Sequence, residues 1–178
     1  MAVLRKTIEG ITMRRFWKGF LIFVLGGVLG TGAGFALGIF FYPYIFLADV
    51  TASDTVADRA AKVVSARATF IHADPRDPVH YGKGTATVFA DLVHLEADFE
   101  VGPGPRYHVY LSRKERIRKN ADFDEAASLH LGRLKAFKGS QNYALPAGTN
   151  IADFKSLVIW CKAFNVLVSP ADLQFAAK

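Results

Sequence analysis

The sequence predicts one membrane-spanning helix followed by a single all-β domain, either an antiparallel β-sandwich or a flattened barrel. Two observations support this prediction. Residues 19–48 form a run of thirty residues without a charged side chain. From residue 68 onward, short apolar runs with a period of two are separated by Gly, Pro and Asp turn signals. After the tail and anchor, about 125 residues remain for the β domain, enough for one domain with its own core.

The uncharged run is long enough to cross a bilayer, which needs about 20 apolar residues of helix. A core helix of a soluble domain would carry a polar stripe, and this run has none. A cleaved signal peptide is the alternative, but its apolar region would hold only about 7–15 residues. An uncleaved anchor is therefore favoured, and Pro43 is expected to bend or end the helix near the outer surface.

The charges that flank this run predict its orientation. Residues 1–18 hold five Lys and Arg residues against one acid, and the first charge after the run is Asp49. Basic residues stay on the cytoplasmic side, so the N-terminus is expected inside and the C-terminal domain outside. The sequence thus predicts a single-pass protein of the inner (cytoplasmic) membrane with its C-terminal domain in the periplasm. Beyond residue 18 the net charge is only +2 of the total +6, which gives no case for nucleic-acid binding.

Four glycines recur every fourth residue along the predicted span: Gly26, Gly30, Gly34 and Gly38. Residues four apart share a helix face, so these glycines predict a groove in which another helix can approach closely. The simpler alternative is that glycine is common in membrane helices. Three overlapping GxxxG spacings favour a specific partner, either a second copy or other transmembrane helices of a membrane protein complex.

Residues 49–65 are interpreted as a stalk or linker. Residues 53–64 predict a short stalk helix, because Ser53 or Asp54 can cap it and alanine is frequent.

The β domain is assigned to residues 66–175. Its predicted strands are 69–71, 85–89, 92–99, 107–111, 131–137 and 157–161, with 163–168 continuing or pairing with the last. Residues 157–161 are apolar on both faces and predict a central strand. Residues 112–128 predict an exposed, partly helical excursion, and residues 139–148 predict a loop.

The exported part resembles the DM13 domain family over residues 66–173. The matching residues are His80, Gly82 and Gly84; Asp98-Phe99; Gly104-Pro105; His108-Val109-Tyr110-Leu111-Ser112; Leu131-Gly132 and Leu134-Lys135; Gly139, Gln141, Tyr143, Leu145 and Pro146; Val158-Ile159-Trp160-Cys161; and Phe164, Ala171 and Leu173. The chain departs from the family pattern at Arg106 and in the basic excursion at 113–119.

The resemblance implies a small extracytoplasmic β-rich module of a kind often found beside DOMON or cytochrome modules. It also implies a redox or electron-transfer association, proposed for the family largely because of the cysteine in the VIWC strand. No cofactor is firmly attached to the fold, so none is expected here.

Cys161 is the redox candidate and the only cysteine of the chain, so no intrachain disulfide is available. Its neighbours Val158, Ile159 and Trp160 indicate burial, which raises a thiol pKa and makes the thiol inert. Structural packing is favoured over redox or ligand duty.

Among the five histidines, His80 and His108 fall on family-matching positions and are the candidate ligands. No histidine belongs to a metal-binding spacing, so no metal site is expected, and a hydrogen bond to a loop carbonyl is the favoured interpretation of both side chains. Glu96 and Asp98 alternate onto one strand face without a nucleophile nearby, so no catalytic residue is predicted and the chain is not expected to be an enzyme.

Five basic residues form the partner-binding candidate: Arg113, Lys114, Arg116, Arg118 and Lys119. A solvated loop is the simpler interpretation, and an acidic protein partner is the alternative.

The function expected from these observations is an accessory or scaffolding subunit of a larger inner-membrane complex, plausibly a respiratory or photosynthetic electron-transport assembly. The alternatives are a redox module that uses Cys161, and a self-associating envelope module that binds a small ligand.

Overall fold

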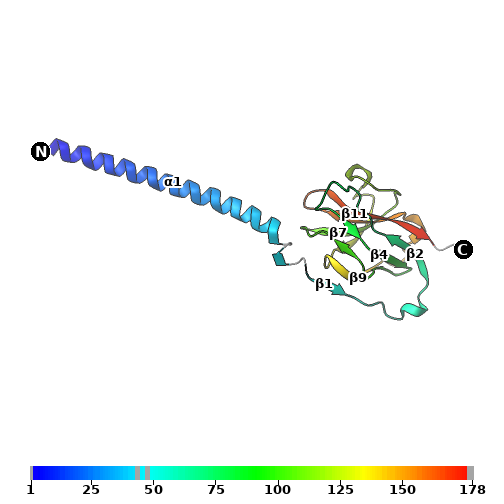
Figure 1. Ribbon diagram of the computed structural model, residues 1–178. Helices are drawn as coiled ribbons and strands as arrows, with labels where there is room; N and C mark the ends of the chain where they lie inside the picture. The colour runs from blue at the N-terminus through cyan, green and yellow to red at the C-terminus, as the bar shows by residue number, and fades with distance from the viewer. Residues whose placement is uncertain (1, 43–44, 47–48, 176–178) are drawn as a thin grey trace. The chain divides into compact units, whose positions relative to one another are not determined.

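The computed structural model describes residues 2–42, 45–46 and 49–175, and the chain divides into two compact units. The first unit ends at Phe41 and comprises helix α1, Ala2–Tyr42, except for its last residue; the second unit holds the β-strands (Figure 1). Pro43, Tyr44, Leu47 and Ala48 lie outside the described residues, so the bend expected at Pro43 stays a prediction.

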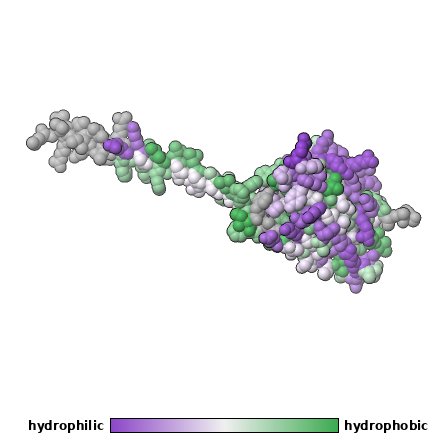
Figure 2. All heavy atoms as spheres, viewed as in Figure 1, coloured by the Kyte–Doolittle hydropathy of each residue, from purple (hydrophilic) through white to green (hydrophobic). Residues whose placement is uncertain are grey.

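Helix α1 contains a 28-residue apolar stretch, Arg15–Tyr42, that is long enough to cross a membrane. Every described side chain in this stretch is exposed within the chain, and Figure 2 shows it mostly in the apolar colours. A helix of this length with exposed apolar side chains is suited to a lipid environment or to packing against other helices. The expected N-terminal apolar helix is therefore confirmed.

The second unit is built on one open sheet of eleven strands. Along the sheet the strands follow the order β3-β6-β9-β5-β4-β2-β11-β10-β7-β8, and β1 joins the outer side of β9. The β1–β9 pairing is parallel, and the other pairings are antiparallel. The strand bounds are β1 Thr51–Ser53, β2 Val64–Thr69, β3 Gly82–Lys83, β4 Thr85–Phe89, β5 Leu92–Leu95, β6 Glu100–Val101, β7 Tyr107–Ser112, β8 Leu129–Arg133, β9 Lys138–Ala144, β10 Ser156–Cys161 and β11 Val166–Phe175.

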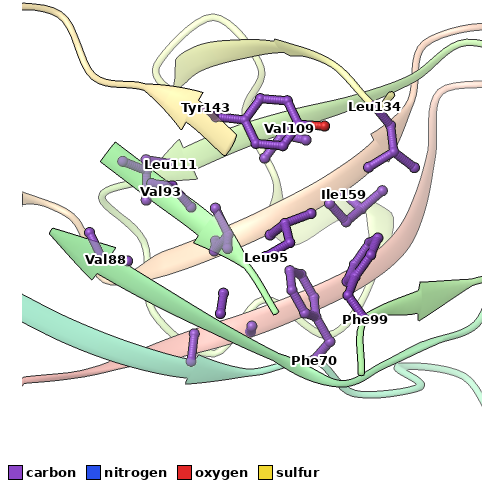
Figure 3. Packing of buried hydrophobic residues seen from close by; sticks show 14 of the residues in the cluster. Phe70, Val88, Val93, Leu95, Phe99, Val109, Leu111, Leu134, Tyr143 and Ile159 are labelled. Atoms are coloured by element: carbon purple, nitrogen blue, oxygen red, sulfur yellow. The ribbon is translucent and has the colours of Figure 1, made fainter. Parts of the chain in front are cut away.

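This architecture confirms the all-β, antiparallel sandwich-type prediction. The sheet folds over a single main core, and Figure 3 shows side chains such as Phe70, Leu95, Phe99 and Ile159 packed together inside it. The path ends at β3 and β8, which do not pair, so the sheet is not closed into a barrel.

Strand β10 is central, as its apolar sequence predicts. All six of its residues are buried, and it pairs with β11 on one side and β7 on the other. A strand covered on both faces needs apolar side chains in both directions, which the run Leu157–Cys161 supplies.

The predicted stalk helix over 53–64 is wrong. Residues 51–53 instead form strand β1, and the only helical turn in the segment is the 3-10 helix Arg59–Ala61. Asp54 accepts hydrogen bonds from the Lys135 ammonium and from the amide of Asn142, so tertiary contacts outweigh the weak helical preference.

The predicted loop over 139–148 is also wrong in its first half, where β9 runs between β5 and β1. The sequence of β9 is polar and lacks the apolar pattern of a strand. Its buried Gln141 is nevertheless fully bonded: the side-chain oxygen accepts hydrogen bonds from the amides of Lys135 and Ala136, and the side-chain nitrogen donates to the carbonyl of Ala136. Buried amides satisfied in this way fit a strand interior.

Three other strands have bounds that differ from the predicted ones. The strand predicted at 69–71 is β2, which covers 64–69. Strand β5 ends at Leu95 rather than at residue 99, and β8 covers 129–133 rather than 131–137. Most of the excursion at 112–128 is exposed as expected, but Ser112, Ile117 and Phe123 are buried. Its helical part is a single 3-10 turn, Asn120–Asp122.

Candidate functional site

The candidate residues lie on opposite faces of the β7–β10 strand pair. Cys161 is opposite Tyr107, and Trp160 is opposite His108. Neighbouring residues of a strand point to opposite faces. Cys161 and Tyr107 accordingly belong to the main core, whereas Trp160 lies in a second apolar cluster on the other face.

Cys161 is enclosed. Its side chain has 0% exposure, and its Sγ donates a hydrogen bond to the carbonyl oxygen of Pro105 at 3.3 Å. Burial raises the pKa of the thiol, and the nearby amides of Phe164 and Ala163 only partly oppose this effect. A thiol that is buried and protonated is a poor nucleophile and a poor metal ligand.

Lys162, the adjacent cation, does not activate this thiol. Its ammonium lies 2.6 Å from the carboxylate of Glu125, and it is 6.0 Å from the centre of the Tyr110 ring. Both contacts belong to the Trp160 side of the sheet.

That outer face brings His108 together with a second histidine, His130. The Nδ1 atom of His108 lies 2.9 Å from the Nε2 atom of His130, and the ring centroids are 5.0 Å apart. The two rings come from neighbouring strands, β7 and β8. His130 is exposed and His108 is partly buried.

A β-bulge in β8 places His130 there. Val109 pairs with Gly132 and Tyr110 pairs with His130, so Leu131 is the extra residue. Without this extra residue the two-residue period would place His130 opposite Leu111, facing the main core. The bulge therefore turns His130 to the same face as His108.

The surroundings of the histidine pair are positively charged. The pKa of His108 is lowered from 6.5 to about 4, first by burial and then by the charges of His130, Lys162, Arg133 and Arg106. His108 is therefore a neutral imidazole near pH 7, so one nitrogen of the close pair carries the hydrogen and the other accepts it.

A series of aromatic rings packs against the histidine pair on the same face of the sheet. Tyr110 stacks against His130 at 4.8 Å between centroids and contacts Phe123 at 5.4 Å, and Phe123 contacts Trp160 at 4.7 Å. The Tyr110 hydroxyl donates a hydrogen bond to Glu125 at 2.8 Å. Burial, and next this bond to a carboxylate, raise the pKa of Tyr110 to about 12.

His80, the other candidate ligand, organises a loop. Its Nδ1 lies 2.8 Å from a carboxylate oxygen of Asp77, whose other oxygen accepts the amides of Val79 and His80. Burial opposes ionisation of Asp77, but these hydrogen bonds outweigh it and lower its pKa to about 2. In the described part of the chain, no three His, Cys, Asp or Glu side chains are grouped to hold a metal, so His80, His108 and Cys161 do not form one site.

The two acidic residues that follow β5 make hydrogen bonds to neighbouring segments. Glu96 accepts hydrogen bonds from Arg59 and Thr87, and Asp98 accepts hydrogen bonds from both the amide and the hydroxyl of Thr85. Buried His94 bonds the side chain of Asn142 at 2.6 Å. These contacts hold neighbouring segments together.

The basic candidate residues are all exposed, but some are neutralised within the domain. Arg118 pairs with Asp172 at 2.5 Å and Lys114 with Asp122 at 3.8 Å, while Arg113 lies over the Phe154 ring. Arg116 and Lys119 make no side-chain ion pair among the described residues.

The glycine candidates in α1 remain open. A Cβ atom placed at any of Gly26, Gly30, Gly34 or Gly38 would meet no atom within 4 Å.

Sequence reasoning counted His130 among the five possible histidine ligands but did not select it, because it lies before the predicted start of its strand and the bulge that orients it has no simple sequence pattern. Tyr110 and Glu125 were also missed as parts of this site. A histidine at each of two neighbouring strands was the only available signal.

One family model, described as Electron transfer DM13, matches residues 76–173, more than half of the chain. The match includes both histidines of the pair, Cys161 and His80. No curated protein and no solved structure matches the chain.

Proposed function

Because this chain belongs to the DM13 family of electron transfer modules, we propose that it is a membrane-anchored accessory or scaffolding subunit of a larger electron-transport assembly. In this proposal α1 docks among the transmembrane helices of the assembly, which is respiratory or photosynthetic. The DM13 domain then lies on the periplasmic side of the inner membrane.

The open glycine face of α1 carries this proposal. Lipid offers no hydrophobic drive for helix association, so close packing over small residues supplies the affinity. Four glycines that recur along one face of α1 favour close packing against a second helix.

The orientation follows from charge. The tail before the apolar run carries a net charge of +4, and the residues immediately after the run are acidic or uncharged. Such asymmetry favours a cytoplasmic N-terminus and an exported domain.

The burial of Cys161 argues for a binding role over thiol chemistry. Electron transfer by a thiol requires a thiolate that a partner can reach. The Cys161 thiol has neither exposure nor a lowered pKa.

The test is extraction of the native protein in mild detergent, followed by size fractionation and identification of co-eluting polypeptides and pigments. We expect elution within a large complex. Gly30→Leu and Gly34→Leu should move the protein to a small species, because leucine fills the groove. Cys161→Ser should remain in the complex.

Ala36→Leu is the matched control. It adds the same side chain to the same helix but two residues beyond Gly34, on the other side of the helix. Elution of the native protein as a lone small species would overturn the proposal, and elution as a defined homo-oligomer would favour the self-associating alternative instead.

A further inference from the structure

We propose that His108 and His130 form a surface binding site for a transition-metal ion, with Cu²⁺ as the ion that fits best. The site goes beyond the accessory-subunit role and does not depend on it. It is assembled by β7 and β8 and involves neither Cys161 nor α1.

The two facing nitrogens are close enough for one ion to bind both. The Nδ1 of His108 and the Nε2 of His130 are 2.9 Å apart, which is an ordinary hydrogen-bond distance. Imidazole nitrogens lie about 2.0–2.1 Å from a bound divalent ion, so two ligands of one ion are about 3 Å apart and small movements of the rings place both nitrogens on it. Imidazole suits Zn²⁺, Ni²⁺ and Cu²⁺, and Cu²⁺ binds such nitrogen ligands most strongly of the three.

Both nitrogens are available to a metal. Within the described residues, each has only the other as a hydrogen-bond partner. On binding, the proton between them moves to the other nitrogen of its ring through solvent, and each facing nitrogen donates a lone pair. No electron is transferred in this step, so the charge of the ion is unchanged.

The strands hold the two imidazoles in place. His108 lies within the β7–β10 and β7–β8 ladders, and the bulge at Leu131 fixes the side to which His130 points. The Tyr110 ring, 4.8 Å from His130 between centroids, supports that imidazole from one side. A ligand pair held by two hydrogen-bonded strands loses little conformational entropy when the metal binds.

The site is open. His130 is exposed, and in the described part of the chain no third His, Cys, Asp or Glu joins the pair. Water, or a ligand from another molecule, would complete the coordination. This open geometry is suited to an ion that exchanges ligands or meets a partner.

Neighbouring cations limit the affinity. Arg133 is directly opposite His108 across the β7–β8 pair, and Lys162 and Arg106 also act on His108. Removal of one of these charges should therefore strengthen the binding of a divalent cation. Arg133→Gln supplies a second, independent test, because it changes no ligand and should tighten binding at least several-fold.

The experiment is titration of the untagged full-length protein in detergent with CuCl₂, in a buffer that does not coordinate metal, read by calorimetry and electron paramagnetic resonance. We expect one Cu²⁺ per chain, with a spectrum that shows two coupled nitrogens. His130→Ala should weaken binding at least tenfold and remove the coupling. Because His130 is exposed, this variant should keep the native circular dichroism spectrum.

His72→Gln is the control, since it removes an imidazole outside the pair, and it should bind Cu²⁺ like the unmodified protein. Binding that survives His130→Ala unchanged would overturn the proposal, as would equal losses in both variants. Absence of stoichiometric binding to the unmodified protein would overturn it as well, and tighter binding of Zn²⁺ than of Cu²⁺ would refute the choice of Cu²⁺.

Discussion

The Sγ atom of Cys161 donates a hydrogen bond to the carbonyl oxygen of Pro105, 3.3 Å away, inside the main core. Pro105 belongs to the Gly-Pro turn that precedes β7, and Cys161 ends β10. The bond therefore ties a turn to the central strand, which is a structural task for a thiol.

The first prediction concerns the reactivity of this thiol. In the native protein, Cys161 should react with a thiol reagent such as DTNB only at the rate at which the domain opens, because the side chain is buried and its pKa is raised. The measurement compares the reaction rate without denaturant with the rate in urea above the unfolding midpoint. Rapid labelling of the folded chain would contradict this prediction.

The second prediction concerns truncation of the same residue. Cys161→Ala should lower the free energy of unfolding by about 1–2 kcal/mol, since it leaves a small cavity and removes the bond to Pro105. Cys161→Ser should leave the domain folded, because the serine hydroxyl can donate a hydrogen bond to the same carbonyl oxygen. Urea unfolding followed by tryptophan fluorescence gives both values.

The third prediction concerns the loss of folding stability at acidic pH. The pKa of His108 falls from 6.5 to about 4 on folding. Between these values the unfolded chain binds a proton that the folded chain does not, so stability decreases as the pH falls from 6.5 towards 4. His108→Asn removes this contribution and should show a shallower loss of stability over the same interval.

The measurement is urea unfolding at pH 7, 5.5 and 4.5 for both proteins, with NMR titration of the His108 ring as a direct check. Val63→Asn, which changes an exposed side chain and removes no titrating group, serves as the control and should keep the slope of the unmodified protein. Equal slopes for His108→Asn and the unmodified protein would show that His108 does not titrate abnormally.

Sequence patterns predicted the parts of the fold that depend on long or strongly apolar runs. The helix was predictable because no charge interrupts residues 19–48, and β10 because Leu157–Cys161 is apolar on both faces. The burial of Cys161 followed from the same run. Local composition was sufficient in these places.

The missed features depend on contacts distant in sequence. Strand β9 has the composition of a loop, and its buried Gln141 is acceptable only because the chain at 135–136 returns to bond it. Likewise, His130 faces His108 only because of one extra residue in β8. Neither event leaves a periodic signal, so of this histidine pair only His108 was selected as a candidate ligand.

The fourth prediction concerns the attachment of β1. Asp54 accepts hydrogen bonds from Lys135 and from the amide of Asn142; the bond from Lys135 is the largest influence that lowers the pKa of Asp54. Asp54→Ala should lower the free energy of unfolding by about 1 kcal/mol, a value limited by the exposure of the pair. It should also speed hydrogen exchange at the Asn142 amide.

Glu115→Ala is the control for this change. Glu115 is exposed and makes no side-chain hydrogen bond or ion pair among the described residues, so both readouts should match the unmodified protein. Unchanged exchange at Asn142 in Asp54→Ala would mean that Asp54 does not fasten the strand.

The fifth prediction concerns Gly139, which pairs with Ala52 where β1 meets β9. Its φ angle is +85°, and a Cβ atom there would collide with the carbonyl oxygen of Ala52. Gly139→Ala therefore combines a backbone conformation that alanine rarely adopts with a steric clash against backbone. Gly148→Ala separates the two effects, because Gly148 has a φ of +81° but open space around its Cβ position. We expect Gly148→Ala to cost about 1 kcal/mol and Gly139→Ala clearly more, with loss of exchange protection in β1. Equal losses in the free energy of unfolding for the two variants would mean that β1 moves away from Gly139 without destabilising the domain, and β1 would then be only weakly attached to β9.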